Sequence, residues 1–80
     1  MFINKTEEGK NNTTGENIAL LRKKLGLSQR ALADKLQLMG LDVNKNAIQR
    51  MESGQRFITD IEILFLKEAL NVTLEELFKQ

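Results

Sequence analysis

Side chains that can form paired hydrogen bonds with nucleic-acid bases are concentrated in one short stretch of the chain. Asn and Gln can pair with adenine through two hydrogen bonds, and Arg or Lys can pair with guanine. The residues of this kind are Asn44, Lys45, Asn46, Gln49 and Arg50. Positions 46 and 50 are one helical turn apart, so on a helix they share a face and can contact neighbouring base pairs. Taken alone, such a cluster is typical of any solvent-exposed helix face, and the elements around it decide between the two interpretations.

The stretch from Ser28 to Gly54 contains the signals of two successive helices separated by a turn. Ser28 and Asn44 are residue types that cap helix N-termini, where the side-chain oxygen accepts a hydrogen bond from a free backbone N–H. Gly40 and Gly54 suit the left-handed conformation that commonly ends a helix. The side chains that can hydrogen-bond to bases therefore fall at the second helix of a predicted helix–turn–helix. This second helix, over residues 45–53, is the predicted recognition helix.

Three further helices are predicted outside this stretch. Thr14 is expected to cap a helix that ends at Gly26. Thr59 and Thr73 are each followed three residues later by Glu, which is the capping-box pattern that opens a helix. No segment has a strong strand signal, so the fold class is predicted to be all-α, with five helices in one domain over residues 14–80.

Residues 1–13 are rich in Asn, Thr, Lys and Glu and show no helical periodicity. We expect this segment to be a flexible N-terminal arm. Lys5 and Lys10 could instead reach around a DNA duplex, as basic arms do. Glu7 and Glu8 offset their charge, which favours the flexible arm over the DNA-binding one.

The composition excludes several classes of function for a chain of 80 residues, which is long enough for one small core. There is no Cys and no His, so disulfides, thiolate metal sites and the commonest catalytic base are excluded. The two Ser residues have no base near them in the sequence, and there is no Gly-rich phosphate loop. We expect no enzymatic activity, no metal and no cofactor. The chain has no apolar run of about 20 residues and its start does not resemble a signal peptide, so a cytoplasmic location is expected.

The net charge is only +1, but the charges are unevenly distributed. From Arg22 to Arg56 the chain has eight basic and three acidic residues, whereas from Phe57 onward it has two basic and five acidic residues. The electrostatic field of a domain with one basic and one acidic side turns its basic side towards a polyanion. The distribution therefore favours a nucleic-acid partner, although the total charge does not.

An ordered set of motifs along the chain carries a family resemblance. Its members are Leu21-Arg22, Gly26-Leu27-Ser28-Gln29, Leu32-Ala33, the spaced residues Asn44, Ile48, Glu52 and Gly54, and Leu70-Asn71-Val72-Thr73 followed by Leu77. With this set, residues 16–78 resemble the phage-repressor type of helix-turn-helix domain, the Cro/repressor or Xre-like family. The resemblance implies a lambda-repressor-like arrangement of the five helices.

The resemblance also implies roles for residues on several elements. The helix over residues 45–53 is expected to enter the major groove, and the Gln that opens the preceding helix to contact a phosphate and brace the recognition helix. The expected DNA-contacting residues are Gln29, Arg30, Asn44, Lys45, Asn46, Gln49, Arg50 and Arg56. Arg22 and Glu52 are expected instead to form a structural ion pair that ties the recognition helix to the core. The turn over residues 37–43 is several residues longer than in the family, which could shift the entry angle of the recognition helix.

The predicted helix from Thr59 to Leu70 is apolar over most of its circumference, which is typical of a helix covered on more than one side. One explanation is a homodimer, and the other is that the extra apolar residues only complete a small core. In the homodimer, the interface residues are Ile61, Leu64, Phe65 and Phe78.

The function expected from these observations is sequence-specific binding of double-stranded DNA as a transcriptional regulator, with repression as the expected direction. Its operator is expected to be two-fold symmetric, with half-sites about 34 Å apart. The alternative is a protein-interaction module, such as an antitoxin or anti-repressor partner, that uses the same fold. Affinity for duplex DNA at low salt distinguishes the two. No small-molecule ligand is expected.

Overall fold

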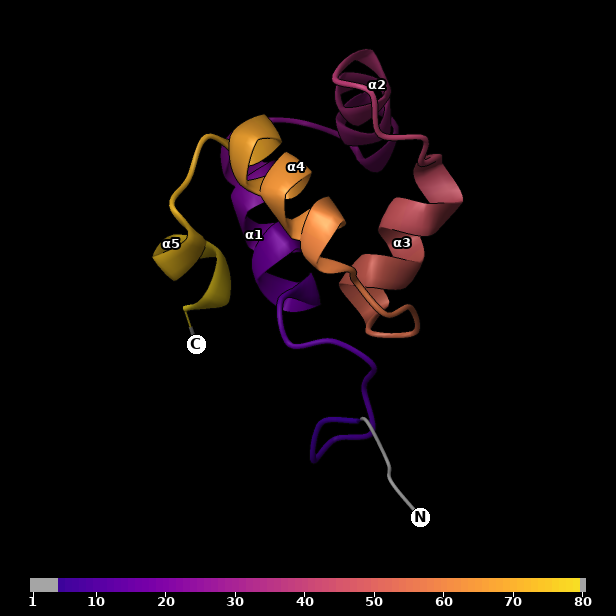
Figure 1. The fold of residues 1–80 in the computed structure, drawn as a ribbon, viewed down its shortest axis with the longest axis vertical. Helices are drawn as coiled ribbons and strands as arrows, with labels where there is room; N and C mark the ends of the chain where they lie inside the picture. The colour runs from indigo at the N-terminus through magenta and orange to yellow at the C-terminus, as the bar shows by residue number, and fades with distance from the viewer. Residues whose placement is uncertain (1–4, 80) are drawn as a thin grey trace.

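Five helices form the part of the chain that the structure, a computed structural model, describes, namely residues 5–79. Their bounds are α1 Gly15–Lys24, α2 Gln29–Leu38, α3 Lys45–Ser53, α4 Asp60–Leu70 and α5 Leu74–Phe78 (Figure 1). The prediction of an all-α fold with five helices is confirmed. Among residues 5–79, every helix is too short or too polar to be a membrane span.

Four of the five helices have the side-chain cap that the sequence predicts. Ser28 and Asn44 each accept a hydrogen bond from the backbone N–H three residues on, at 3.0 and 2.9 Å. Thr59 and Thr73 form complete capping boxes with the Glu three residues on. Each cap satisfies backbone N–H groups that have no partner inside the helix, so these starts are determined by local sequence.

Helix α1 begins where the sequence predicts, after Thr14 at the N-cap position, but the Thr14 side chain does not cap it. Thr14 is buried, its backbone is already helical at φ −96° and ψ −12°, and its side chain makes no capping hydrogen bond. The side-chain Oδ1 of Asn12 instead accepts a hydrogen bond from the Gly15 N–H at 2.8 Å. The predicted N-cap position is therefore confirmed, but the capping hydrogen bond comes from the Asn12 side chain and not from Thr14.

The helices enclose one hydrophobic core. Helix α3 packs against α1 and α2, α4 packs against the same two helices, and α5 packs against α1 (Figure 1). The largest fully buried apolar side chains are Ile18, Leu32, Leu36, Ile48, Met51, Leu66, Leu70 and Leu77. Because α3 contributes Ile48 and Met51 to this core, its opposite face remains at the surface.

The segment that precedes α1 passes close to the C-terminal end of α3 (Figure 1). The Asn11 N–H donates a hydrogen bond to the Gly54 carbonyl at 2.8 Å. Of the flexible arm predicted over residues 1–13, residues 1–4 lie outside the described part of the chain. Residues 10–12 are hydrogen-bonded to the helical domain, Lys10 through Glu16 and the two Asn residues through the end of α3 and the loop after it.

Candidate nucleic-acid interface

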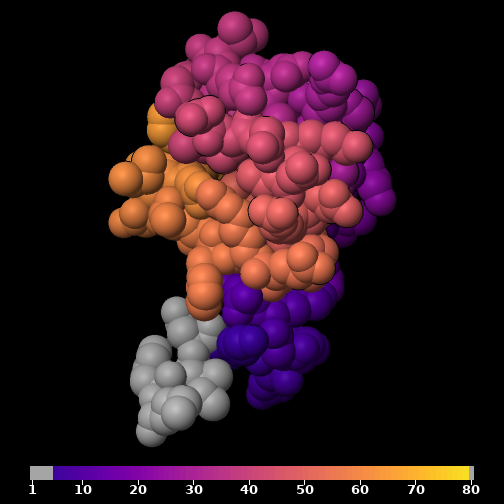
Figure 2. Space-filling view, turned by 90° about the vertical axis from the view of Figure 1, so that its right-hand side faces the viewer, coloured from indigo at the N-terminus to yellow at the C-terminus, as the bar shows by residue number. Residues whose placement is uncertain are grey.

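Helix α3 presents four polar side chains on one exposed face. Ile48 and Met51 are fully buried, and the residues on the other face are Lys45, Asn46, Gln49 and Arg50, all exposed. Within residues 5–79, none of the four side chains forms a hydrogen bond or ion pair with another residue. Figure 2 shows α3 across the middle of this face, with α2 and the following turn above it and the loop after α3 below it. The four side chains are therefore free to bind an external partner.

Asn44 lies at the edge of this face and has a different role in the fold. Its Oδ1 accepts the capping hydrogen bond from the Ala47 N–H. The side chain is exposed, and its amide N–H₂ group has no partner among residues 5–79. Asn44 can therefore donate to a phosphate or a base only through that group while it caps α3.

A buried ion pair connects the recognition helix to the core. Arg22 on α1 and Glu52 on α3 form two hydrogen bonds, Nε–Oε2 at 2.7 Å and Nη2–Oε1 at 3.0 Å, and their side chains are only 9% and 8% exposed. The third guanidinium nitrogen, Nη1, donates to the Leu27 carbonyl at 2.8 Å, in the turn between α1 and α2. Two parallel hydrogen bonds fix orientation as well as distance, so this pair helps to set how α3 sits on α1.

Gln29 extends this network from the start of α2. Its Nε2 donates to Oε1 of Glu52 at 3.0 Å, so the side-chain amide is bound to the recognition helix. Its neighbour Arg30 is exposed, and the Arg30 side chain has no hydrogen-bonding partner within residues 5–79. In this arrangement Gln29 braces α3. Arg30, in the N-terminal turn of α2, is free to bind an anion at that end of the helix.

Arg56 lies in the loop after the C-terminal end of α3, and its side chain forms an ion pair within the protein. Its Nη1 pairs with the buried Glu62 carboxylate at 2.9 Å, and that carboxylate also accepts a hydrogen bond from the Thr59 N–H. About a third of the Arg56 side chain remains exposed. The guanidinium still has donors that can face a phosphate, but its charge is partly neutralised.

The long turn between α2 and α3 is fastened at both ends. The Leu41 N–H donates to the Leu36 carbonyl at 2.9 Å, and the Gln37 Nε2 donates to the Val43 carbonyl at 2.6 Å. Val43 is buried in the core. The additional residues therefore form a defined connection, in which Gln37 is a contributor that the sequence patterns did not identify.

The sequence patterns also missed three residues, in and just before α1, that contact the C-terminal end of α3. Asn11, Asn12 and Gly15 contact the last turn of the recognition helix or the loop that follows it. The available signal was the pair of consecutive Asn residues ahead of a helix, because Asn is a strong capping residue. That signal shows a cap but does not show which carbonyl groups the amides bind.

A small helical domain that presents a capped helix with its polar face outward, braced by the helix before it, has the architecture of a helix-turn-helix DNA-binding domain. The comparisons agree with this class. The family model described as helix-turn-helix matches residues 18–77. A solved structure, the restriction-modification controller protein C.AhdI from Aeromonas hydrophila, is 32% identical, with a TM-score of 0.72 over 82% of this chain and 92% of that chain. A search of curated proteins finds no match.

The chain thus belongs to the helix-turn-helix family of the Xre or lambda-repressor-like type. The predicted family and the predicted function, sequence-specific DNA binding as a transcriptional regulator, are confirmed at this level.

Proposed function

We propose that this protein binds a two-fold symmetric duplex as a homodimer and represses transcription from it, with Lys45, Asn46, Gln49 and Arg50 contacting base edges in the major groove. The observation that carries the proposal is the exposed face of α3, where these side chains have no partner within residues 5–79 while the helix beneath them is fixed by the Arg22–Glu52 pair. Fixed backbone and free side chains are what direct readout of bases requires. The proposal gives the protein a regulatory role and no catalytic one.

Four other residues are proposed to contact the DNA backbone around this face. Arg30 and Asn44 offer free donors beside α3, while Gln29 and Arg56 are each bound inside the protein and would contribute their remaining polar atoms. Phosphate contacts of this kind fix the register of the recognition helix without reading sequence. The similarity to a restriction-modification controller protein supports a corresponding role for this chain, as a controller of restriction-modification genes.

The first test is selection of duplexes from a random pool, followed by binding measurements with Arg50→Ala. Arg50 has the side chain best suited to two hydrogen bonds with a guanine, so the variant should lose about 1–3 kcal/mol on the selected duplex and bind unrelated duplexes almost as well as the wild type. Fluorescence anisotropy at one fixed salt concentration measures both affinities. Lys79→Ala removes an exposed charge from the end of α5 and should leave both unchanged. A wild type that binds no duplex at low salt would favour the protein-interaction module.

A second test concerns the dimer. Ile61 and Leu64 on α4 are 62% and 57% exposed, and Phe78 on α5 is 49% exposed, so all three are available to a second copy. Phe65, which the sequence analysis placed in the same interface, is partly buried against the core, and a charge there would also disturb the fold. Ile61→Glu is therefore the cleaner variant and should convert a dimer into a folded monomer, because an unpaired carboxylate in an apolar interface is costly.

Sedimentation velocity at high micromolar concentration measures this effect. Leu38→Glu is the matched control, since Leu38 is 90% exposed at the end of α2 and lies outside the proposed interface. The control should sediment like the wild type. A wild type that is already monomeric at this concentration would contradict the proposed dimer and leave the exposed residues without that role.

A further inference from the structure

One amide side chain in the segment before α1 holds three elements together. Asn12 Oδ1 caps α1 by accepting the Gly15 N–H, as described above. Its Nδ2 donates to the Met51 carbonyl in the last turn of α3 at 3.0 Å and to the Arg56 carbonyl in the following loop at 2.7 Å. The three hydrogen bonds of the Asn12 side chain thus join the start of α1, the last turn of α3 and the loop that follows α3.

Its neighbours extend this contact, and we call residues 10–12 the N-terminal clasp. The Asn11 Nδ2 donates to the Gln55 carbonyl at 2.8 Å, beside the backbone hydrogen bond from Asn11 to Gly54. The Lys10 side chain covers Gly54 so closely that a Cβ there would lie 2.7 Å from the Lys10 Cγ. The clasp therefore supplies additional hydrogen-bond donors to one carbonyl in the last turn of α3 and to carbonyls of the loop that follows it.

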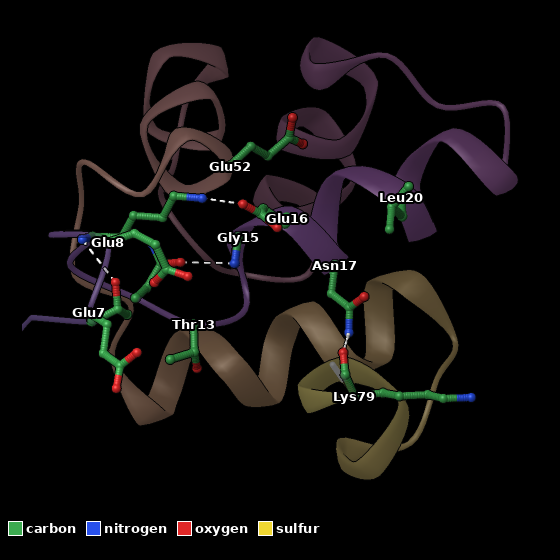
Figure 3. Close-up of a pocket in the computed structure, with 12 residues that line it drawn as sticks. Glu7, Glu8, Thr13, Gly15, Glu16, Asn17, Leu20, Glu52 and Lys79 are labelled. Atoms are coloured by element: carbon green, nitrogen blue, oxygen red, sulfur yellow. Dashed lines mark hydrogen bonds and ion pairs between the residues drawn. The ribbon is translucent and has the colours of Figure 1, made fainter.

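The clasp is also tied to α1 on its other side. The Lys10 ammonium donates to the Glu16 carboxylate, and this hydrogen bond holds the pKa of Glu16 below its usual value and that of Lys10 above it. Figure 3 shows the Glu16 carboxylate and the Gly15 nitrogen close together, each joined by a dashed line to its partner, among the residues that line a surface pocket of about 630 Å³. The N-terminal clasp consequently connects the end of α3 to α1.

We propose that Asn12 is a positioning residue for DNA recognition: through the N-terminal clasp it sets the last turn of α3 and the loop that carries Arg56 relative to the DNA. This inference rests on the proposed base contacts of α3. It assigns a role to a segment that precedes the region matched by the helix-turn-helix family model, which begins at residue 18. Base readout requires the recognition helix to be held to within about 0.5 Å, so a loosened C-terminal turn should weaken binding even when the domain is folded.

The chain offers a matched control for a merely structural role. Asn17 has the same type of side chain, lies near the same end of α1, and donates its Nδ2 to the carbonyls of Glu76 and Leu77 in α5 at 3.1 and 3.0 Å. Figure 3 shows it directed towards the C-terminal end of α5 at Lys79, away from the clasp. Loss of Asn17 should therefore affect stability as loss of Asn12 does, without affecting α3.

The experiment compares Asn12→Ala, Asn12→Asp and Asn17→Ala at a temperature where circular dichroism shows each to be folded. The probe is the duplex selected from the random pool by the wild type. We expect Asn12→Ala to bind it about tenfold more weakly, which corresponds to one or two lost hydrogen bonds, and Asn17→Ala to bind within twofold of the wild type. Asn12→Asp keeps the acceptor for Gly15 but places a carboxylate oxygen against the carbonyl oxygens of Met51 and Arg56, and this repulsion should impair it at least as much as Asn12→Ala.

Hydrogen exchange provides a readout that does not depend on DNA. In Asn12→Ala, the backbone amides of residues 53–57 should exchange faster, whereas in Asn17→Ala they should not. Wild-type affinity in Asn12→Ala, equal losses in Asn12→Ala and Asn17→Ala, or normal affinity in Asn12→Asp would each overturn the proposal. If the wild type itself binds no duplex, the proposed function fails, and the exchange data still show whether Asn12 orders the end of α3.

Discussion

Replacing Arg22 by Met is expected to lower the free energy of unfolding by about 3–5 kcal/mol, because it leaves the Glu52 carboxylate buried with only the Gln29 amide as a partner. The variant also loses the hydrogen bond to the Leu27 carbonyl. The total stability of an 80-residue domain is on the order of 4–12 kcal/mol, so the loss is a substantial part of the total and the variant should unfold at a much lower urea concentration than the wild type. Urea denaturation followed by circular dichroism measures the change.

Two comparison variants separate the buried pair from the general loss of a positive charge. Lys23→Met removes the neighbouring, exposed charge and should change stability by no more than about 0.5 kcal/mol. The double variant Arg22→Met/Glu52→Leu removes both charges and should recover much of the lost stability, because apolar residues of similar size replace a buried pair well. A loss below about 1 kcal/mol in Arg22→Met would show that the pair contributes little to holding α3.

The same double variant separates stability from function. Without Glu52, the Gln29 amide has no acceptor on α3, so the start of α2 is no longer bound to the recognition helix. A stable double variant that binds the selected duplex less tightly would show that the network positions α3 for DNA. That outcome is the one expected from the geometry, since the network joins α1, α2 and α3 at one point.

The fold could be predicted from the sequence where the determining interactions are local. Ser28, Asn44, Thr59 and Thr73 each bind a backbone group three residues away, so residue type and spacing are sufficient to find the helix starts. The start of α1 was predicted correctly, but its capping side chain was not, because Thr14 and Asn12 are both good capping residues and packing decides between them. Thr14 is drawn into the interior, and Asn12 is left to cap.

The candidate site could be predicted only in part, for a related reason. The exposed face of α3 follows from helical periodicity once Ile48 and Met51 are assigned to the core. The contacts of Asn11 and Asn12 join residues about 40 positions apart in the sequence, and no local pattern shows which distant carbonyls they bind. Arg56 illustrates the same limit, because its partner Glu62 was identified as a capping residue and not as the anion that holds Arg56.

Gly15→Ala is expected to lower the free energy of unfolding by about 1–3 kcal/mol, although helix propensity alone predicts a gain of about 1 kcal/mol from this change at a helical position. A Cβ on Gly15 would lie 2.0 Å from the Met51 carbonyl oxygen and 2.8 Å from the Asn12 Oδ1. The first contact is with backbone, so relief requires α1 and the last turn of α3 to move apart. Thermal or urea denaturation determines the sign, and a variant as stable as the wild type would contradict the close approach of the two helices.

The displacement should also reach the DNA-binding face, because the atom that must move belongs to the recognition helix. Gly15→Ala should therefore bind the selected duplex more weakly at a temperature where it is folded. Gly26→Ala is the comparison, since Gly26 has φ +71° but open space around its Cβ position. That variant should lose roughly 1 kcal/mol of stability from backbone strain and keep its DNA affinity. A loss of affinity in Gly15→Ala alone would show that contact with α1 sets the position of α3, from the same end of the helix that Asn12 holds.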